Sequence, residues 1–296
     1  SVASRLGDAA AALAGRVAGN DHVIGIELLN EPFAGSATLR CIVNGCSDRN
    51  TQLADRYAEM VAPIRSAAPE LPIWQEPFAP TGILAPNGLP PRPVAPTSTG
   101  PQIGLAWHLY CNDTDGGVTE QAPGGTAIWC QDRFRRGFDN GQAMATVLGG
   151  PALLNEFGAS ANPLDATLAT READRRFVSW MYWHLAPAVT SDDSQLPDLV
   201  ESQIIRPYPQ ATAGTPGLLS FDPGTGRFEY RWRPDAAIAL PTSIVVPRRQ
   251  FPDGYDVQVR HGVVTSAPDA PERDTGKKSW HQDQEKAALP VLVAPQ

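Results

Sequence analysis

Apolar residues along the first two thirds of the chain occur in two patterns. Short, nearly continuous apolar runs predict strands that are buried on both faces, and apolar positions three and four residues apart predict amphipathic helices. The predicted strands are residues 23–29, 71–75, 103–109, 151–155 and 177–183. The predicted helices are residues 2–18, 48–67, 131–147 and 164–175, and the proline-rich run 77–101 is expected to be a long loop. This alternation of strand and helix over residues 1–205 predicts an α/β domain with a parallel sheet.

The pattern changes after about residue 205, where short β-like segments are separated by turn signals such as Asp222-Pro223-Gly224. The segments are 218–221, 227–232, 242–246, 255–260 and 289–294. They predict a small all-β sandwich over residues 206–296, with a charged surface loop at 267–286. Its aromatic residues lie in strand-like runs that suit a core better than a carbohydrate-binding surface: Phe221, Phe228, Tyr230 and Trp232.

Composition narrows the function classes. The chain has 296 residues, of which 42% are hydrophobic, so it can bury a sizeable core in one or two domains. Its formal net charge of −8 argues against nucleic acid as the main partner. No apolar run reaches the roughly 18 residues that a membrane-spanning helix needs, so no transmembrane segment is expected.

Two predicted strands end in a glutamate that is followed at once by residues that stop a strand. The first ends at Glu31, before Pro32, and the second at Glu156, before Phe157-Gly158. Barrel enzymes keep their chemistry at the carboxyl ends of their parallel strands. Two carboxylates that face each other there are the minimal set for cleaving a glycosidic bond, one as acid and one as nucleophile. Glu31 suits the acid/base role and Glu156 the nucleophile.

The two glutamate motifs give the chain a family resemblance. Asn30-Glu31-Pro32 and Glu156-Phe157-Gly158 resemble the strand-four and strand-seven motifs of glycoside hydrolase family 5. The resemblance implies a (β/α)8 TIM barrel of which residues 1–205 are the C-terminal part, strands four to eight. The first three barrel strands are then expected to precede Ser1.

The resemblance also implies substrate-binding residues. His108 and Tyr110 match the family's strand-six pair, whose tyrosine bonds the nucleophile, and Trp183 matches the strand-eight tryptophan beneath the sugar. Asn30 is expected to bond the sugar 2-hydroxyl. A structural histidine at position 108 and a core tryptophan at position 183 are the alternative readings. No cofactor and no metal are expected.

Further motifs resemble the endoglycoceramidase branch of the family. These are 30–35, 179–183 and the junction 206–216. The branch implies a retaining endo-β-glycosidase that hydrolyses the linkage between a glycan and a ceramide by double displacement. Its partners would be a glycolipid substrate and, transiently, a lipid surface. The alternatives are another family-5 β-glycosidase, acting on a steryl glucoside or a β-glucan, and a non-catalytic truncated fragment.

Four cysteines lie in polar, glycine-containing stretches after predicted strands, and they allow three pairings. Local bridges Cys41–Cys46 and Cys111–Cys130 are the simplest of these. A zinc site is disfavoured because neither CxxC nor HExxH is present. Disulfides would indicate an oxidising compartment, and a secreted protein is therefore expected.

Overall fold

The structure, a computed structural model, describes most of the chain in two compact units. It describes residues 1–44, 46–79, 89–92, 103–111, 124–158, 163–183, 198–260, 262–264, 266, 277–282 and 289–295. The first unit comprises residues 1–116, 123–159 and 178–183, and the second comprises 117–122, 160–177 and 184–296. Most of the loop predicted over 77–101 lies outside the described residues, and the predicted domain boundary at 205/206 stays a prediction.

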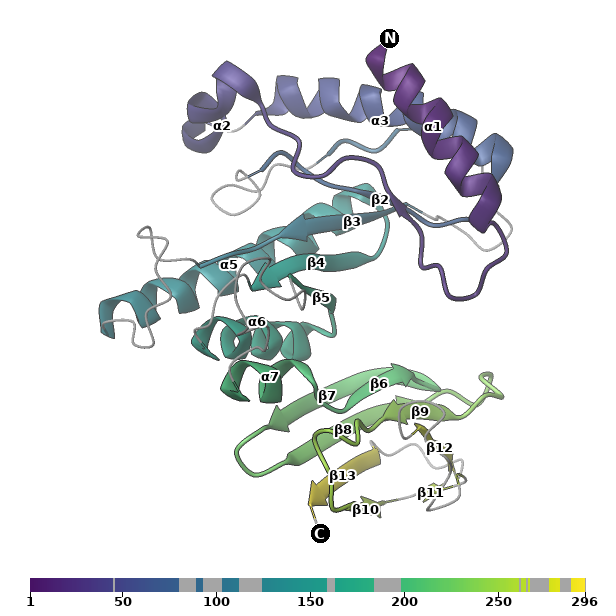
Figure 1. Ribbon diagram of the computed structural model, residues 1–296, viewed down its shortest axis with the longest axis vertical. Helices are drawn as coiled ribbons and strands as arrows, with labels where there is room; N and C mark the ends of the chain where they lie inside the picture. Colours follow the sequence, from purple (N-terminus) through teal and green to yellow (C-terminus); the bar gives the residue numbers. More distant parts are fainter. Residues whose placement is uncertain are drawn as a thin grey trace, which may run out of the picture. The chain divides into compact units, whose positions relative to one another are not determined.

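The first unit is built on a five-stranded parallel sheet (Figure 1). Its strands are β1 (Ile26–Glu27), β2 (Ile73–Gln75), β3 (Ile103–His108), β4 (Ala152–Gly158) and β5 (Ser179–Trp183). They lie in chain order, and every neighbouring pair is parallel. Successive β/α units produce this order, and the sheet is consistent with part of a TIM barrel.

The helices of the first unit follow the predicted amphipathic pattern. They are α1 (Val2–Val17), the short 3-10 turn η1 (Gly35–Ala37), α2 (Thr38–Asn44), α3 (Ser47–Ala67) and α5 (Gly124–Leu148). The apolar face of α3 is buried as its spacing predicts: Leu53, Tyr57, Met60, Val61 and Ile64. Helix α1 packs against α3, and α5 packs against β3 and β4. The short segments η1 and α2 were not predicted, because their few residues show no period.

The start of β1 and the end of β4 differ most from the prediction, and a glycine with positive φ lies at each. Strand β1 has two residues rather than seven, and Gly25, with φ of 136°, lies just before it. Strand β4 extends to Gly158, so Glu156 lies within the strand rather than at its end. Gly158 has φ of 112°, and a Cβ there would lie 2.4 Å from the Tyr182 ring. Glycine is therefore required where β4 approaches β5.

The described residues of the second unit form two helices and two four-stranded antiparallel sheets. The helices are α6 (Pro163–Arg176) and α7 (Asp198–Ile204). One sheet has the order β10-β13-β8-β7, from Tyr255–Val259, Leu289–Pro295, Arg227–Pro234 and Gly214–Asp222. The other has the order β11-β12-β9-β6, from Gly262–Val264, Lys277–Gln282, Thr242–Val245 and Tyr208–Ala211. The all-β character predicted after residue 205 is thus confirmed.

The surface loop predicted at 267–286 is wrong for six of its residues. Lys277–Gln282 form β12, which pairs with β9 on one side and β11 on the other. The charged, apolar-poor sequence gave no strand signal there. Backbone pairing with two neighbouring strands overrides side-chain preference at such a position. Segments β6, β11 and α7 were not predicted either, because each is too short to show a clear period.

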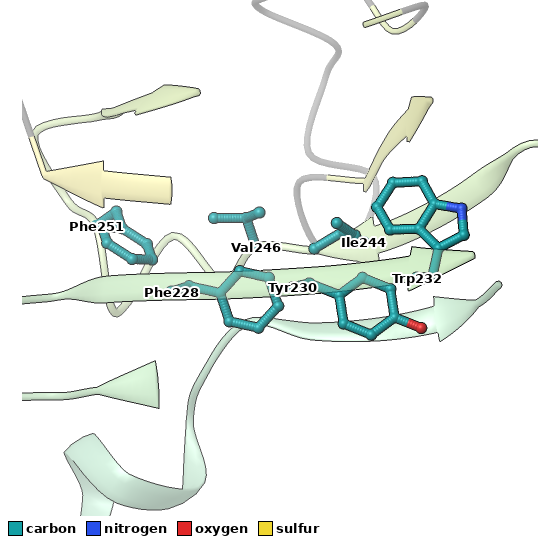
Figure 2. Close-up of a cluster of buried hydrophobic side chains, with 6 residues drawn as sticks. All are labelled: Phe228, Tyr230, Trp232, Ile244, Val246 and Phe251. Carbon is teal, nitrogen blue, oxygen red and sulfur yellow. The ribbon is translucent and has the colours of Figure 1, made fainter. Parts of the chain in front are cut away.

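Aromatic side chains fill the core of the second unit, as Figure 2 shows. Phe228, Tyr230 and Trp232 alternate along β8 and are at most 1% exposed. They pack with three further buried residues, Ile244, Val246 and Phe251. The Tyr230 and Trp232 rings stack with centroids 5.3 Å apart, and the Tyr230 hydroxyl lies 2.5 Å from Thr212 Oγ1. These aromatics serve the core, as their spacing predicts, and Phe221 packs partly buried against them.

A buried ion pair joins α6 to the residues just before β6. Arg206 Nη2 donates to Asp174 Oδ2 of α6 at 2.5 Å, and both side chains are at most 10% exposed. The Arg206 guanidinium also lies over the Phe221 ring of β7, 5.1 Å from its centroid. Burial raises the pKa of Asp174 to about 6, although Arg206 acts in the opposite direction.

Both predicted cysteine pairs are disulfides in the structure. Cys41 is joined to Cys46, and Cys111 to Cys130. The first bridge lies beside the turn formed by η1, where Ala37 is buried with both cysteines. Among the described helices, none combines the length and the apolar character that crossing a membrane requires.

Candidate active site

Glu31 lies where the chain leaves the sheet after β1, next to the segment that follows β2. Pro32 O accepts a hydrogen bond from Ala79 N at 2.9 Å, so the two segments continue side by side beyond the strands. The backbone of Glu31 is left-handed, with φ of 44°. Its N–H donates to Glu76 Oε2 at 2.6 Å. Side chains other than glycine adopt this conformation only where contacts hold them there.

One imidazole lies among three glutamates at the carboxyl ends of the strands. His108, the last residue of β3, has Nδ1 2.9 Å from Glu31 Oε1 and 3.6 Å from Glu76 Oε1. Its Nε2 lies 3.5 Å from Glu156 Oε2. The side chain of His108 is 5% exposed, so packing fixes the ring. The contact at 2.9 Å is a hydrogen bond, while the other two distances are long for one.

Glu156 faces Glu31 across this imidazole. A carboxylate oxygen of each glutamate and a nitrogen of His108 all lie within 4.8 Å of one another. The Tyr110 hydroxyl donates to Glu156 Oε1, and the backbone O of Glu156 accepts from Leu109 N at 3.0 Å. Glu31 is the more exposed of the two, at 45% of its side chain against 16% for Glu156. The carboxyl groups are therefore close enough to act on opposite faces of one sugar carbon.

Four glutamates lie around the single imidazole of His108, so acidic groups outnumber basic ones among the described residues of the site. Burial raises the pKa of Glu76 to about 9, and the negative charges of Glu27, Glu31 and Glu156 add to this effect. The hydrogen bond from Glu31 N acts in the opposite direction. Burial also raises the pKa of Glu27, against a hydrogen bond from Asn155. Burial and the neighbouring Glu156 raise the pKa of the Tyr110 hydroxyl, which therefore stays protonated and remains a donor.

The other two predicted site residues lie at the same end of the sheet. Trp183 ends β5 and is in register with Gly158, two residues beyond Glu156. Its side chain is half exposed, which fits a surface open to a ligand better than core packing. Asn30 immediately precedes Glu31 and is exposed.

Sequence reasoning missed Glu27 and Glu76. Asn155 Nδ2 donates to Glu27 Oε1 at 2.8 Å, and an oxygen of each missed glutamate lies within 4.8 Å of a His108 nitrogen. A signal was present for both of them. Glu76 precedes Pro77 after an apolar run, just as Glu31 precedes Pro32, and Glu27 interrupts a strand that is otherwise apolar.

Two overlapping sets of side chains have ligand atoms close enough to share a cation. They are Glu31–His108–Glu156 and Glu27–Glu76–His108. Both depend on the single imidazole of His108, whose Nδ1 already contacts Glu31. The Tyr110 hydroxyl occupies one oxygen of Glu156. Each group in the first set thus already has a hydrogen-bonding partner, which suits proton transfer between side chains.

Family models and one relative match most of the chain. Residues 2–189 match Cellulase (glycosyl hydrolase family 5), and residues 206–291 match the Glycoside hydrolase family 5 C-terminal domain. Endoglycoceramidase I of Rhodococcus hoagii (strain 103S) is 38% identical over 268 residues, which cover 90% of this chain and 53% of that protein.

Solved structures give the same result for the fold. Endo-glycoceramidase II from Rhodococcus sp., in complex with ganglioside GM3, superposes with a TM-score of 0.81 and 26% identity. The match covers 99% of this chain and 64% of that one. Sterylglucosidase 1 of Cryptococcus neoformans shares the fold at a TM-score of 0.61 and 14% identity, over 82% of this chain and 44% of that one. The chain thus spans between about half and two thirds of the length of its endoglycoceramidase relatives, and it belongs to glycoside hydrolase family 5 as an endoglycoceramidase-like member.

Proposed function

We propose that this chain carries the two catalytic carboxylates of a retaining endo-β-glycosidase that separates a glycan from ceramide. Glu31 is the acid/base and Glu156 the nucleophile. The observation that carries the proposal is the approach of their oxygens to within 4.8 Å across His108. Retaining glycosidases hold their two carboxyl groups about 5–5.5 Å apart, whereas inverting enzymes leave room for a water molecule between them.

The surroundings of Glu156 support its role as nucleophile. A nucleophilic carboxylate must be ionised and held toward the anomeric carbon. The Tyr110 hydroxyl donates to one of its oxygens, which fixes the direction of the carboxylate. Glu31 is more exposed, so it can reach both a leaving oxygen and, later, a water molecule.

The reaction then proceeds in two displacements. In the first, a Glu156 oxygen bonds to the anomeric carbon while Glu31 gives its proton to the glycosidic oxygen, and ceramide leaves as an alcohol. In the second, Glu31 removes a proton from water, the water oxygen bonds to the anomeric carbon, and the bond to Glu156 breaks. The sugar is released with its original configuration, and both glutamates return to their starting states.

The remaining residues hold the substrate in this proposal. The half-exposed Trp183 provides an apolar face for a pyranose ring, and Asn30 bonds the sugar 2-hydroxyl. His108 lies within reach of both catalytic glutamates and orients Glu31. Strands β1 to β5 correspond to barrel strands four to eight.

The experiment that tests the roles compares two variants in the protein that contains this chain. Glu31→Gln should lose roughly 10²–10⁴-fold in kcat with a natural leaving group, and Glu156→Gln at least as much. Azide added to Glu156→Ala should give a glycosyl azide of inverted configuration, because azide replaces the missing nucleophile. Near-parental rates in both variants would overturn the assignment.

The substrate class needs a separate assay. Identity of 38% to an endoglycoceramidase supports a glycosphingolipid, and the half-exposed Trp183 is compatible with any β-glucoside. A panel of lactosylceramide, a steryl glucoside and a soluble β-glucan distinguishes the three. Preference for either of the last two would replace the ceramide proposal while leaving the glutamate roles intact.

We further propose that the protein is secreted and meets its substrate at a lipid surface. Two disulfides support an oxidising compartment. Cell fractionation tests the location, and sedimentation with glycolipid vesicles tests the surface contact.

A further inference from the structure

Glu76 is a buried carboxyl group directly behind the proposed acid/base. It follows β2, and its side chain is 2% exposed. Its own backbone is held on both sides by one hydroxyl of α3. Tyr57 OH donates to Glu76 O at 2.7 Å and accepts from Glu76 N at 3.2 Å. Glu76 therefore occupies a fixed position. It takes no part in the bond changes of either proposed displacement.

The side chain of Glu76 contacts Glu31 through the backbone. Oε2 accepts the Glu31 N–H at 2.6 Å, at the one residue of this segment whose φ is positive without being glycine. A left-handed glutamate requires such an anchor, because the extended conformation is otherwise favoured. The backbone conformation sets where the half-exposed carboxylate of Glu31 points.

Glu76 also reaches the imidazole that contacts the Glu31 side chain. Its Oε1 lies 3.6 Å from His108 Nδ1, and the same nitrogen lies 2.9 Å from Glu31 Oε1. One carboxyl group thus touches the backbone of Glu31 and the partner of its side chain. The two contacts together define the orientation of the acid/base toward Glu156.

We propose that Glu76 is a positioning residue that holds Glu31 in its productive conformation while itself remaining an uncharged carboxylic acid. The inference rests on the acid/base role proposed for Glu31. An uncharged group is favoured because three other acids of the described residues interact with it: Glu27 on β1, Glu31 beyond β1, and Glu156 on β4. The phenol of Tyr57 contacts its backbone, and the imidazole of His108 contacts its side chain.

The electrostatics of the cluster agree with this state. Burial and the three neighbouring carboxylates raise the pKa of Glu76 to about 9, so the acid form prevails at neutral pH. In that form one oxygen still accepts the Glu31 N–H, and no negative charge is added beside Glu31 or Glu156. An amide has the same shape, charge and acceptor, so glutamine reproduces the proposed state, whereas leucine removes the acceptor.

The test compares Glu76→Gln with Glu76→Leu, with Glu59→Gln on α3 as the matched control outside the site. The first readout needs no activity: the Glu31 amide resonance in protein labelled with nitrogen-15 at glutamate alone, identified by its absence in Glu31→Gln. The second is kcat and KM for glycosides with good and poor leaving groups. A misplaced acid slows glycosides with poor leaving groups more than those with good ones, because only poor leaving groups depend on protonation. General loss of structure would slow both equally.

We expect Glu76→Gln to keep the amide resonance and a kcat within about threefold of the parent. Glu76→Leu should shift the resonance and lower kcat by up to about 10²-fold for a poor leaving group, with little change in KM. Where Glu76→Leu does not fold, Tyr57→Phe, which releases the backbone of Glu76, should shift the resonance in its place.

Equal damage by the glutamine and leucine variants would show that an ionised carboxylate is needed, and would overturn the inference. So would an unshifted Glu31 resonance in Glu76→Leu or, where that variant does not fold, in Tyr57→Phe. Absence of any glycosidase activity in the parent would instead refute the proposed function, and the amide readout would still decide whether Glu76 holds the Glu31 backbone.

Discussion

The buried pair between Asp174 and Arg206 allows a prediction in which the cost of each single substitution depends on pH. Its carboxyl group has a pKa of about 6, above the ordinary 3.8, even with a guanidinium 2.5 Å away. Desolvation therefore outweighs the attraction between the charges. The pair as a whole adds little stability, yet breaking it should be costly, because one charge would be left buried alone.

The magnitude follows from what each substitution leaves behind. Removing one partner of a buried pair costs about 3–5 kcal/mol. Arg206→Met leaves Asp174, which can take up a proton, so the loss should be small at about pH 5 and full at about pH 8. Asp174→Asn resembles the uncharged acid that already prevails in the parent at about pH 5, so its loss should also be small there and full at about pH 8.

The double variant Asp174→Leu with Arg206→Met is the decisive control. Replacing both charges with apolar groups should cost less than either single change, because no uncompensated charge remains. Urea unfolding of the parent and the three variants at both pH values provides the free energies. With a slope of about 1–3 kcal/mol per molar urea, a full single loss of about 3–5 kcal/mol corresponds to a midpoint shift of roughly 1–5 M.

If both single variants lost under about 1 kcal/mol at about pH 8, the pair would be hydrated rather than buried. If Arg206→Met lost the same at both pH values, Asp174 would not be taking up the proton. If the double variant were the least stable, the pair would be net stabilising, and burial would not dominate its energetics.

Four further outcomes are expected. The pKa of Glu76 is raised from 4.5 to about 9, so its contribution to the free energy of unfolding should fall as the pH rises between those values, by at most about 1.4 kcal/mol per pH unit. Glu76→Gln should remove this contribution in a pH series of melts. Replacing Cys111 and Cys130 by serine should cost roughly 3 kcal/mol for a separation of 19 residues, and non-reducing peptide mapping should recover the intact bridge in the parent. Trp232→Ala should cost about 3–5 kcal/mol in denaturant unfolding, whereas a change at an exposed aromatic should cost under about 1 kcal/mol. Trp183→Ala should raise KM more than it lowers kcat in steady-state kinetics, and an unchanged KM would place the sugar elsewhere.

The parallel sheet could be predicted because its strands are apolar runs punctuated by strand-stopping residues. That signal located the regions of all five strands, and the motifs around Glu31 and Glu156 located both glutamates at one end. Local sequence could not set the strand lengths. The positive φ of Gly25 and Gly158 depends on how neighbouring strands approach, which no periodicity reports.

The supporting part of the site could not be predicted for a different reason. Glu76 and Glu27 contact the other groups of the site only after β1, β2 and β3 pair. The pKa of a buried acid depends on these contacts and on burial, so it cannot be predicted from the residue type alone. The sequence contains Glu76-Pro77 after a strand, but no local pattern indicates that Glu76 contacts Glu31. In the second unit, β12 is stabilised by backbone pairing with β9 and β11, although five of its six residues are polar.

The left-handed backbone of Glu31 has a consequence for laboratory evolution. A glutamate at φ of 44° is strained by about 1–3 kcal/mol, whereas glycine or asparagine adopts this conformation at lower cost. Replacement by either residue would also remove a negative charge from a crowded cluster. A library selected only for heat resistance would therefore enrich glycine or asparagine at position 31, and its most robust members would be those without the proposed acid. Selection for a robust enzyme needs turnover in every round.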